Sequence, residues 1–130
     1  GTSARIIDWD QLPNGLLGIT IEGVDRFCIE DVWKKEDGLV FAKINSQEAD
    51  FQEPMQEKWA PLLETIERLK EHPHLQRLNY NIDNKNAWEV GFILAQILPM
   101  PDADKIELLG SDNIENLMIE LSNILKKMSG

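Results

Sequence analysis

The chain has little cysteine and no long apolar run. Its 130 residues include one cysteine, Cys28, which excludes an internal disulfide and leaves no second thiol for a zinc site. No stretch approaches the roughly 18 to 20 apolar residues that a membrane-spanning helix needs, and the first residues lack the basic and apolar regions of a signal peptide. We therefore expect a cytoplasmic protein without a membrane partner, with Cys28 as a small apolar residue in a strand.

Positive charge is also scarce. The chain has 13 Lys and Arg against 23 Asp and Glu, which gives a formal net charge of -10. Residues 1–54 hold 5 basic and 11 acidic side chains, and residues 55–130 hold 8 and 12, so neither part hides a basic surface. Because nucleic-acid phosphates are bound by clustered Lys and Arg, we expect no nucleic-acid partner.

Motifs that would carry nucleotide binding, catalysis or metal binding are missing from these residues. No Gly-x-x-x-x-Gly-Lys-[Ser/Thr] phosphate loop occurs. Ser122 and Lys126 are the only candidates for a helical Ser–Lys dyad, and a polar helix face near the C-terminus explains them fully. His72 and His74 lack the third and fourth ligands of a zinc site. We therefore expect no catalytic residue, no metal and no cofactor.

The first part of the chain, residues 1–53, alternates apolar and polar residues and is rich in β-branched and aromatic ones, which predicts strands. Pro13-Asn14-Gly15 predicts a hairpin turn, Asp37-Gly38 predicts a second turn, and Gly23 suits a bulge or sharp bend. The expected strands cover residues 4–9, 17–23, 26–33 and 39–44. The first part is thus predicted to be an antiparallel β meander.

The second part, residues 54–130, changes to helical periodicity. A first amphipathic helix covers residues 59–69, with Pro61 restricting its start to the neighbourhood of Ala60, and residues 71–74 end it. Further helices are expected at residues 84–98, at 102–109 and from 114 onward. The sequence therefore predicts an α+β fold in one domain over residues 1–130, a meander followed by a bundle of three to four helices.

Short motifs in both parts resemble the substrate-binding domain of Lon-type ATP-dependent proteases. In the first part they read GTSARI at residues 1–6, LPNG at 12–15 and EGVDRF at 22–27. In the second part they read VGFILAQILP at residues 90–99, DKIELL at 104–109 and NIENL at 113–117. Occurring in the family's order, these motifs extend the resemblance over nearly the whole chain.

The resemblance implies a PUA-like β-barrel followed by a helical bundle. In the family the barrel begins well before the position that matches Gly1, so we expect an incomplete barrel without its first strands. The stretch around residues 83–99, with Trp88 preceding Gly91, is closer to stand-alone proteins with only this domain. The resemblance implies a non-catalytic module of protein degradation or quality control. Its implied partners are unfolded or misfolded polypeptides and a separate protease.

Three large apolar residues fit neither the alternation of the strands nor the periodicity of the helices. Trp33 lies at the end of a strand, and Phe51 and Met55 lie in the connector between the two parts. A surface that binds unfolded chains needs exposed aromatic and methionine side chains, which can repack against many sequences. These three are our candidate polypeptide-binding residues. The alternative is that they form the seam joining sheet to helices, or the surface left exposed by the missing strands.

Two further hypotheses concern assembly and function. If the barrel lacks its opening strands, the strand at residues 4–9 or its neighbour becomes an unpaired apolar edge, which predicts a homodimer or strand exchange. The alternative function is that of a small-ligand-binding protein or enzyme with a pocket between sheet and helices. RNA binding, which the PUA-like resemblance raises, is disfavoured by the negative charge.

Overall fold

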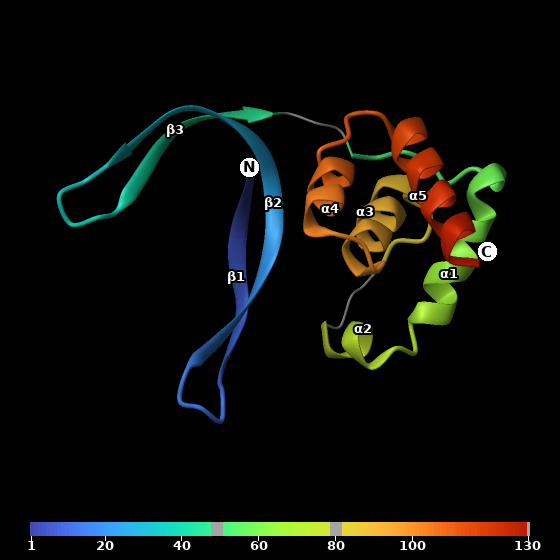
Figure 1. Ribbon diagram of the computed structural model, residues 1–130, viewed down its shortest axis with the longest axis horizontal. Helices are drawn as coiled ribbons and strands as arrows, with labels where there is room; N and C mark the ends of the chain where they lie inside the picture. Colours follow the sequence, from blue (N-terminus) through green and yellow to red (C-terminus); the bar gives the residue numbers. More distant parts are fainter. Residues whose placement is uncertain (48–50, 79–81, 130) are drawn as a thin grey trace. The chain divides into compact units, whose positions relative to one another are not determined.

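The computed structural model describes residues 1–47, 51–78 and 82–129, which fall into two compact units, residues 1–50 and 51–130. The first unit contains β1 (Thr2–Gln11), β2 (Leu17–Lys34) and β3 (Val40–Gln47). The described part of the second contains the 3-10 turn η1 (Glu57–Trp59) and five helices, namely α1 (Ala60–Leu69), α2 (Pro73–Leu78), α3 (Ala87–Ile97), α4 (Asp102–Leu109) and α5 (Ile114–Ser129) (Figure 1). This order confirms the predicted α+β class.

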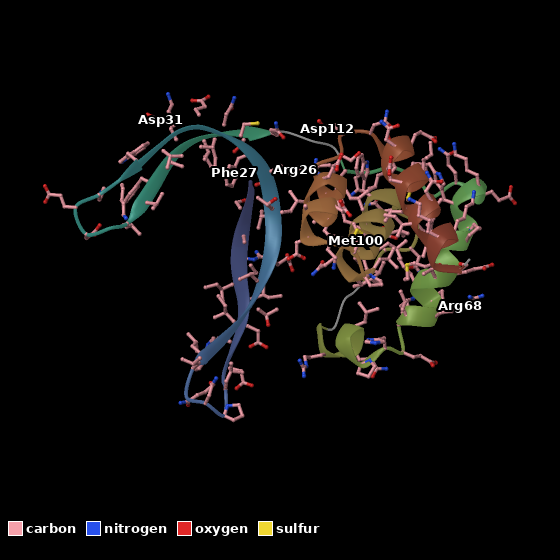
Figure 2. All side chains as sticks on the ribbon, viewed as in Figure 1. Arg26, Phe27, Asp31, Arg68, Met100 and Asp112 are labelled. Carbon is pink, nitrogen blue, oxygen red and sulfur yellow. The ribbon has the colours of Figure 1, made fainter. Side chains whose placement is uncertain are left out.

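The long, bent strand β2 belongs to two hairpins (Figure 1). β1 pairs with β2 between Leu17 and Arg26, and β3 pairs with it between Arg26 and Lys34, both antiparallel. The hairpins meet at Arg26 and Phe27, which are labelled in Figure 2. Phe27 also exchanges two backbone hydrogen bonds with Gly1, of 2.8 and 2.9 Å. Within the described residues the sheet has the order β1-β2-β3 and does not close into a barrel.

The two expected strands around Gly23 are one continuous strand in the structure. The register of β1 against β2 shifts between the pairs Ala4–Gly23 and Thr2–Arg26, so β2 carries an extra residue between Gly23 and Arg26. This irregularity is the bulge that Gly23 predicted, and a bulge bends a strand without ending it.

Both hairpin turns depend on a glycine in the left-handed region. Gly15 has a φ of 83° and Gly38 a φ of 89°, values that an L side chain rarely adopts. Asn14 and Asp37 precede them, and each accepts a hydrogen bond from a backbone N–H two residues further on. The turns predicted from Asn-Gly and Asp-Gly are therefore confirmed.

The core of the second unit surrounds α3, which packs against α1, α4 and α5. Gly91 allows α3 to approach α5 closely, because a Cβ at this position would lie 2.7 Å from Leu117 Cδ2. The buried apolar side chains of this core are Trp59, Leu62, Ile66, Ala87, Trp88, Val90, Leu94, Ala95, Leu98, Leu108, Leu117, Met118 and Leu121. The stabilising apolar burial of the described chain is thus concentrated in the helices.

The described residues contain five helices where the sequence predicts three to four. The additional one is α2, which begins at Pro73, inside the stretch that was expected only to end the first helix. Proline fits the first turn of a helix, where its missing N–H costs no hydrogen bond. Leu75 is buried in α2, so packing stabilises a helix that is too short to persist alone.

The side chain of Asn86 links residues 51–53 to the start of α3 through hydrogen bonds. Its side chain is buried, and its Oδ1 accepts hydrogen bonds from the backbone N–H groups of Trp88 at 3.2 Å and Glu53 at 3.3 Å. Its Nδ2 donates to the carbonyl oxygen of Phe51 at 3.0 Å. One side chain therefore caps α3 and holds residues 51–53 beside it.

We expect Asn86→Ala to lower the free energy of unfolding of the second unit by about 2 kcal/mol, because a helix cap is lost and two connector groups lose their partner. Urea unfolding followed by circular dichroism measures the change. Asn113→Ala is the matched control, since it removes the exposed cap that accepts from Glu115 N at 2.8 Å. The control should lose less than about 1 kcal/mol, and equal losses would contradict the anchoring role.

Candidate polypeptide-binding surface

Trp33 lies near the end of β2 and stacks on an aromatic partner across the hairpin. It is opposite Phe41 of β3, with the ring centroids 6.1 Å apart and the planes 16° from parallel. Lys35 Nζ lies 4.1 Å from the centroid of the Phe41 ring. Trp33 remains 45% exposed, so this pair offers an exposed aromatic side chain beside a ring that carries a cation over its face.

Phe51 and Met55 lie in the second unit, where both are partly buried against the helical core. Phe51 packs edge-on against Trp88 and Phe92, with ring centroids 5.1 and 5.4 Å away. Met55 N donates to Lys85 O at 2.9 Å, which continues the hydrogen bonding of the connector along the start of α3. Trp33 thus belongs to one unit, and the other two predicted residues belong to the second.

The first hairpin carries an apolar face that the sequence analysis did not identify as a site. Ile6 lies opposite Ile21, and Trp9 lies opposite Ile19, and all four side chains are exposed. An extra residue in β1, Ile7, shifts the register between these two pairs and keeps Ile6 and Trp9 on the same face. Strict alternation would have placed them on opposite faces, which is why the pattern hid this surface.

The opposite face of the first hairpin is polar. Arg5 lies opposite Glu22, and their side chains form an ion pair of 3.2 Å. Asp8 lies opposite Thr20 on the same face. The first hairpin is therefore amphipathic, with one face suited to water and the other suited to an apolar partner.

The second hairpin has an exposed apolar face of its own. Ile29 lies opposite Ile44, Val32 lies opposite Ala42, and an extra β2 residue at Glu30 keeps these pairs on one face. The register shift between Gly23 and Arg26 places this face and the apolar face of the first hairpin on opposite sides of β2. None of the described residues of the first unit is buried. Its sheet therefore presents apolar side chains in two directions.

The residues examined as catalytic or metal candidates have local structural partners or incomplete sites. Ser122 Oγ donates to the Met118 carbonyl oxygen of its own helix at 2.8 Å, a common bond of helical serine. His72 is exposed, and the side chain of His74 lies outside the described part. Among the described residues no group of three or more His, Cys, Asp and Glu could hold a metal ion. None of the described helices is long and apolar enough to cross a membrane.

A family model and a related protein both match nearly the whole chain. The family model of the ATP-dependent protease La (LON) substrate-binding domain matches residues 1–127. A Lon protease from Brevibacillus choshinensis is 27% identical over an alignment of 129 positions, which covers 96% of this chain and 17% of that protein. The chain thus spans less than a fifth of that relative.

A solved structure has the same fold. The crystal structure of a Lon N-terminal domain protein from Xanthomonas campestris superposes with a TM-score of 0.72 at 24% identity. The match covers 94% of this chain and 65% of that one. The arrangement of strands followed by helices is thus shared, over about two thirds of the other protein's length.

The tryptophans allow a test of the exposed faces. Trp9 and Trp33 are 68% and 45% exposed, whereas Trp59 and Trp88 are 4% and 5% exposed. We expect Trp9→Phe/Trp33→Phe to shift the emission to shorter wavelength and to remove most of the quenching by acrylamide, because only buried indoles remain. Unchanged quenching would show that the two sheet tryptophans are covered in solution.

Proposed function

We propose that this chain, which belongs to the family of ATP-dependent protease La (LON) substrate-binding domains, is a non-catalytic module that binds unfolded or misfolded polypeptides. The observation that carries the proposal is the first unit's sheet, with exposed apolar side chains on both sides of β2. Exposed apolar surface of this extent marks interaction sites in soluble proteins. An unfolded chain is a fitting partner because its own apolar side chains are exposed.

The way in which the sheet would bind follows from its hydrogen bonding. Beyond the meeting point at Arg26 and Phe27, each half of β2 pairs with a named strand on one side only, within the described residues. An extended polypeptide can add to such an edge through main-chain hydrogen bonds, which do not depend on its sequence. Its apolar side chains would then lie on the exposed faces. This mode suits a module that accepts many different clients.

Trp33 and Trp9 supply the largest exposed aromatic side chains of the proposed surface, one on each hairpin. Trp33 and its partner Phe41 lie on the face of the second hairpin opposite to that of Ile29. Large aromatic side chains supply much contact area at a low cost in conformational entropy. Phe51 and Met55 belong to the proposal through the part of each side chain that remains exposed beside the helical core. Their second role, packing on that core, requires a stability control in any experiment.

In this proposal the module serves protein degradation or quality control, and a separate ATP-dependent protease supplies unfolding and cleavage. The matching segment is 17% of the length of the Brevibacillus choshinensis Lon protease. The family model that matches residues 1–127 of this chain describes a substrate-binding domain. Recognition alone is therefore the activity that we assign to these residues.

Binding of a fluorescently labelled, permanently unfolded polypeptide tests the proposal. We expect saturable binding at micromolar concentration and a loss of about fivefold in affinity for Trp9→Ala and for Trp33→Ala, since each removes an exposed aromatic contact. Ile119→Ala, which removes an exposed apolar side chain of α5, is the matched control and should bind normally. Absence of binding, or equal weakening in all three variants, would refute the proposal.

The exposed edge of β1 generates a proposal about assembly. We propose that two copies pair through β1, because an uncovered edge strand with apolar neighbours is a template for another strand. Sedimentation velocity should show a dimer that grows with concentration. Ile7→Lys places a charge on exposed β1 and should shift the chain toward monomer, whereas Ile119→Lys on α5 should not. A strictly monomeric chain at high micromolar concentration would exclude this pairing.

A further inference from the structure

The helical unit has a groove that none of the sequence motifs indicated. It lies between α4 and α5 and has a volume of about 700 Å³. Leu108 of α4 and Leu117 and Ile124 of α5 line it. Leu108 and Leu117 are buried and Ile124 is partly exposed, so Ile124 supplies most of the apolar surface that the floor offers.

Acidic side chains from both helices border this floor. Asp104 and Glu107 lie four residues and one residue before Leu108 on α4. Glu120 lies one turn before Ile124 on α5. All three carboxylates are exposed, and none forms an ion pair with another residue of the described chain. Lys127 is the one cation among the lining residues. The groove therefore combines an apolar floor with a net negative charge at its rim, three carboxylates against one ammonium group.

We propose that this groove binds a segment of a client polypeptide in which lysine or arginine residues flank one or two apolar residues. The apolar side chain would lie on the floor, and the flanking cations would reach the rim carboxylates. Long basic side chains suit this position because their aliphatic stems cover apolar surface while the charged ends stay in water. The net charge of -10 over the chain adds to the attraction.

This inference rests on the proposed function and names a class of client within it. The sheet would bind extended chains through backbone and apolar contacts, with little dependence on the sign of their charge. The groove would add a preference for basic segments and disfavour acidic ones, since like charges at the rim repel them.

Two labelled peptides with the same central apolar residues, one flanked by lysines and the other by glutamates, test the preference. The lysine-flanked peptide should bind, and raised salt should weaken it because the rim charges are exposed to solvent. Asp104→Asn/Glu107→Gln/Glu120→Gln should weaken it about tenfold, through the summed loss of three exposed charge pairs. Equal binding of both peptides would overturn the inference.

A matched triple variant distinguishes binding in the groove from attraction by the negative charge of the whole protein. Glu57→Gln/Glu64→Gln/Glu71→Gln removes the same charge from exposed positions of the second unit that do not line the groove. It should leave binding of the lysine-flanked peptide nearly unchanged. A loss equal to that of the groove variant would show nonspecific attraction and would overturn the inference.

Filling the groove tests its shape without changing its charge. Asn116 is an exposed lining residue at the start of α5, so Asn116→Trp should obstruct the floor and weaken the lysine-flanked peptide. Unchanged binding would place the peptide elsewhere and overturn the inference. If these tests fail while an uncharged unfolded polypeptide still binds through Trp33, only the groove inference is lost. If that binding fails too, the proposed function fails with it.

Discussion

A sheet of one layer cannot bury either of its own faces, and this constraint underlies the account of the molecule. Three strands form a continuous ladder through β2, yet none of the described residues of the first unit is buried. Hydrogen bonds between strands stabilise a sheet only modestly in water, so its apolar side chains favour a covering partner. The helical unit contrasts with it, because its core around α3 is closed by its own helices. Burial of apolar side chains therefore stabilises the helical unit, whereas those of the described part of the sheet are exposed.

Three irregularities in the ladder decide what the sheet presents. The extra residues at Ile7 and Glu30 each keep one cluster of apolar pairs on a single face of its hairpin, and the shift between Gly23 and Arg26 places the two clusters on opposite sides of β2. The proposed client-binding surface therefore depends more on the register of the strand pairs than on the amino-acid composition. A bulge moves every following side chain of its strand to the other face, so the proposed surface is sensitive to a single residue.

Local signals predicted much of this fold. The Asn-Gly and Asp-Gly turns and the change of period near residue 54 each have a local chemical cause. Register bulges depend on pairing between strands, so the common face of Ile6 and Trp9 was not visible in the one-dimensional pattern. The start of α2 at Pro73 was missed because proline signals both the end of one helix and the beginning of another. The groove between α4 and α5 depends on tertiary packing, which no local motif specifies.

Amide hydrogen exchange of this chain, with and without a saturating unfolded polypeptide, tests the central claim most directly. The account predicts that the client slows exchange in β2 and the strands beside it, because added main-chain hydrogen bonds and covered faces protect these amides. Exchange in the buried helix α3 should stay the same. Protection confined to the helical unit, with β1 to β3 unchanged by a bound client, would contradict the assignment of the sheet as the polypeptide-binding surface.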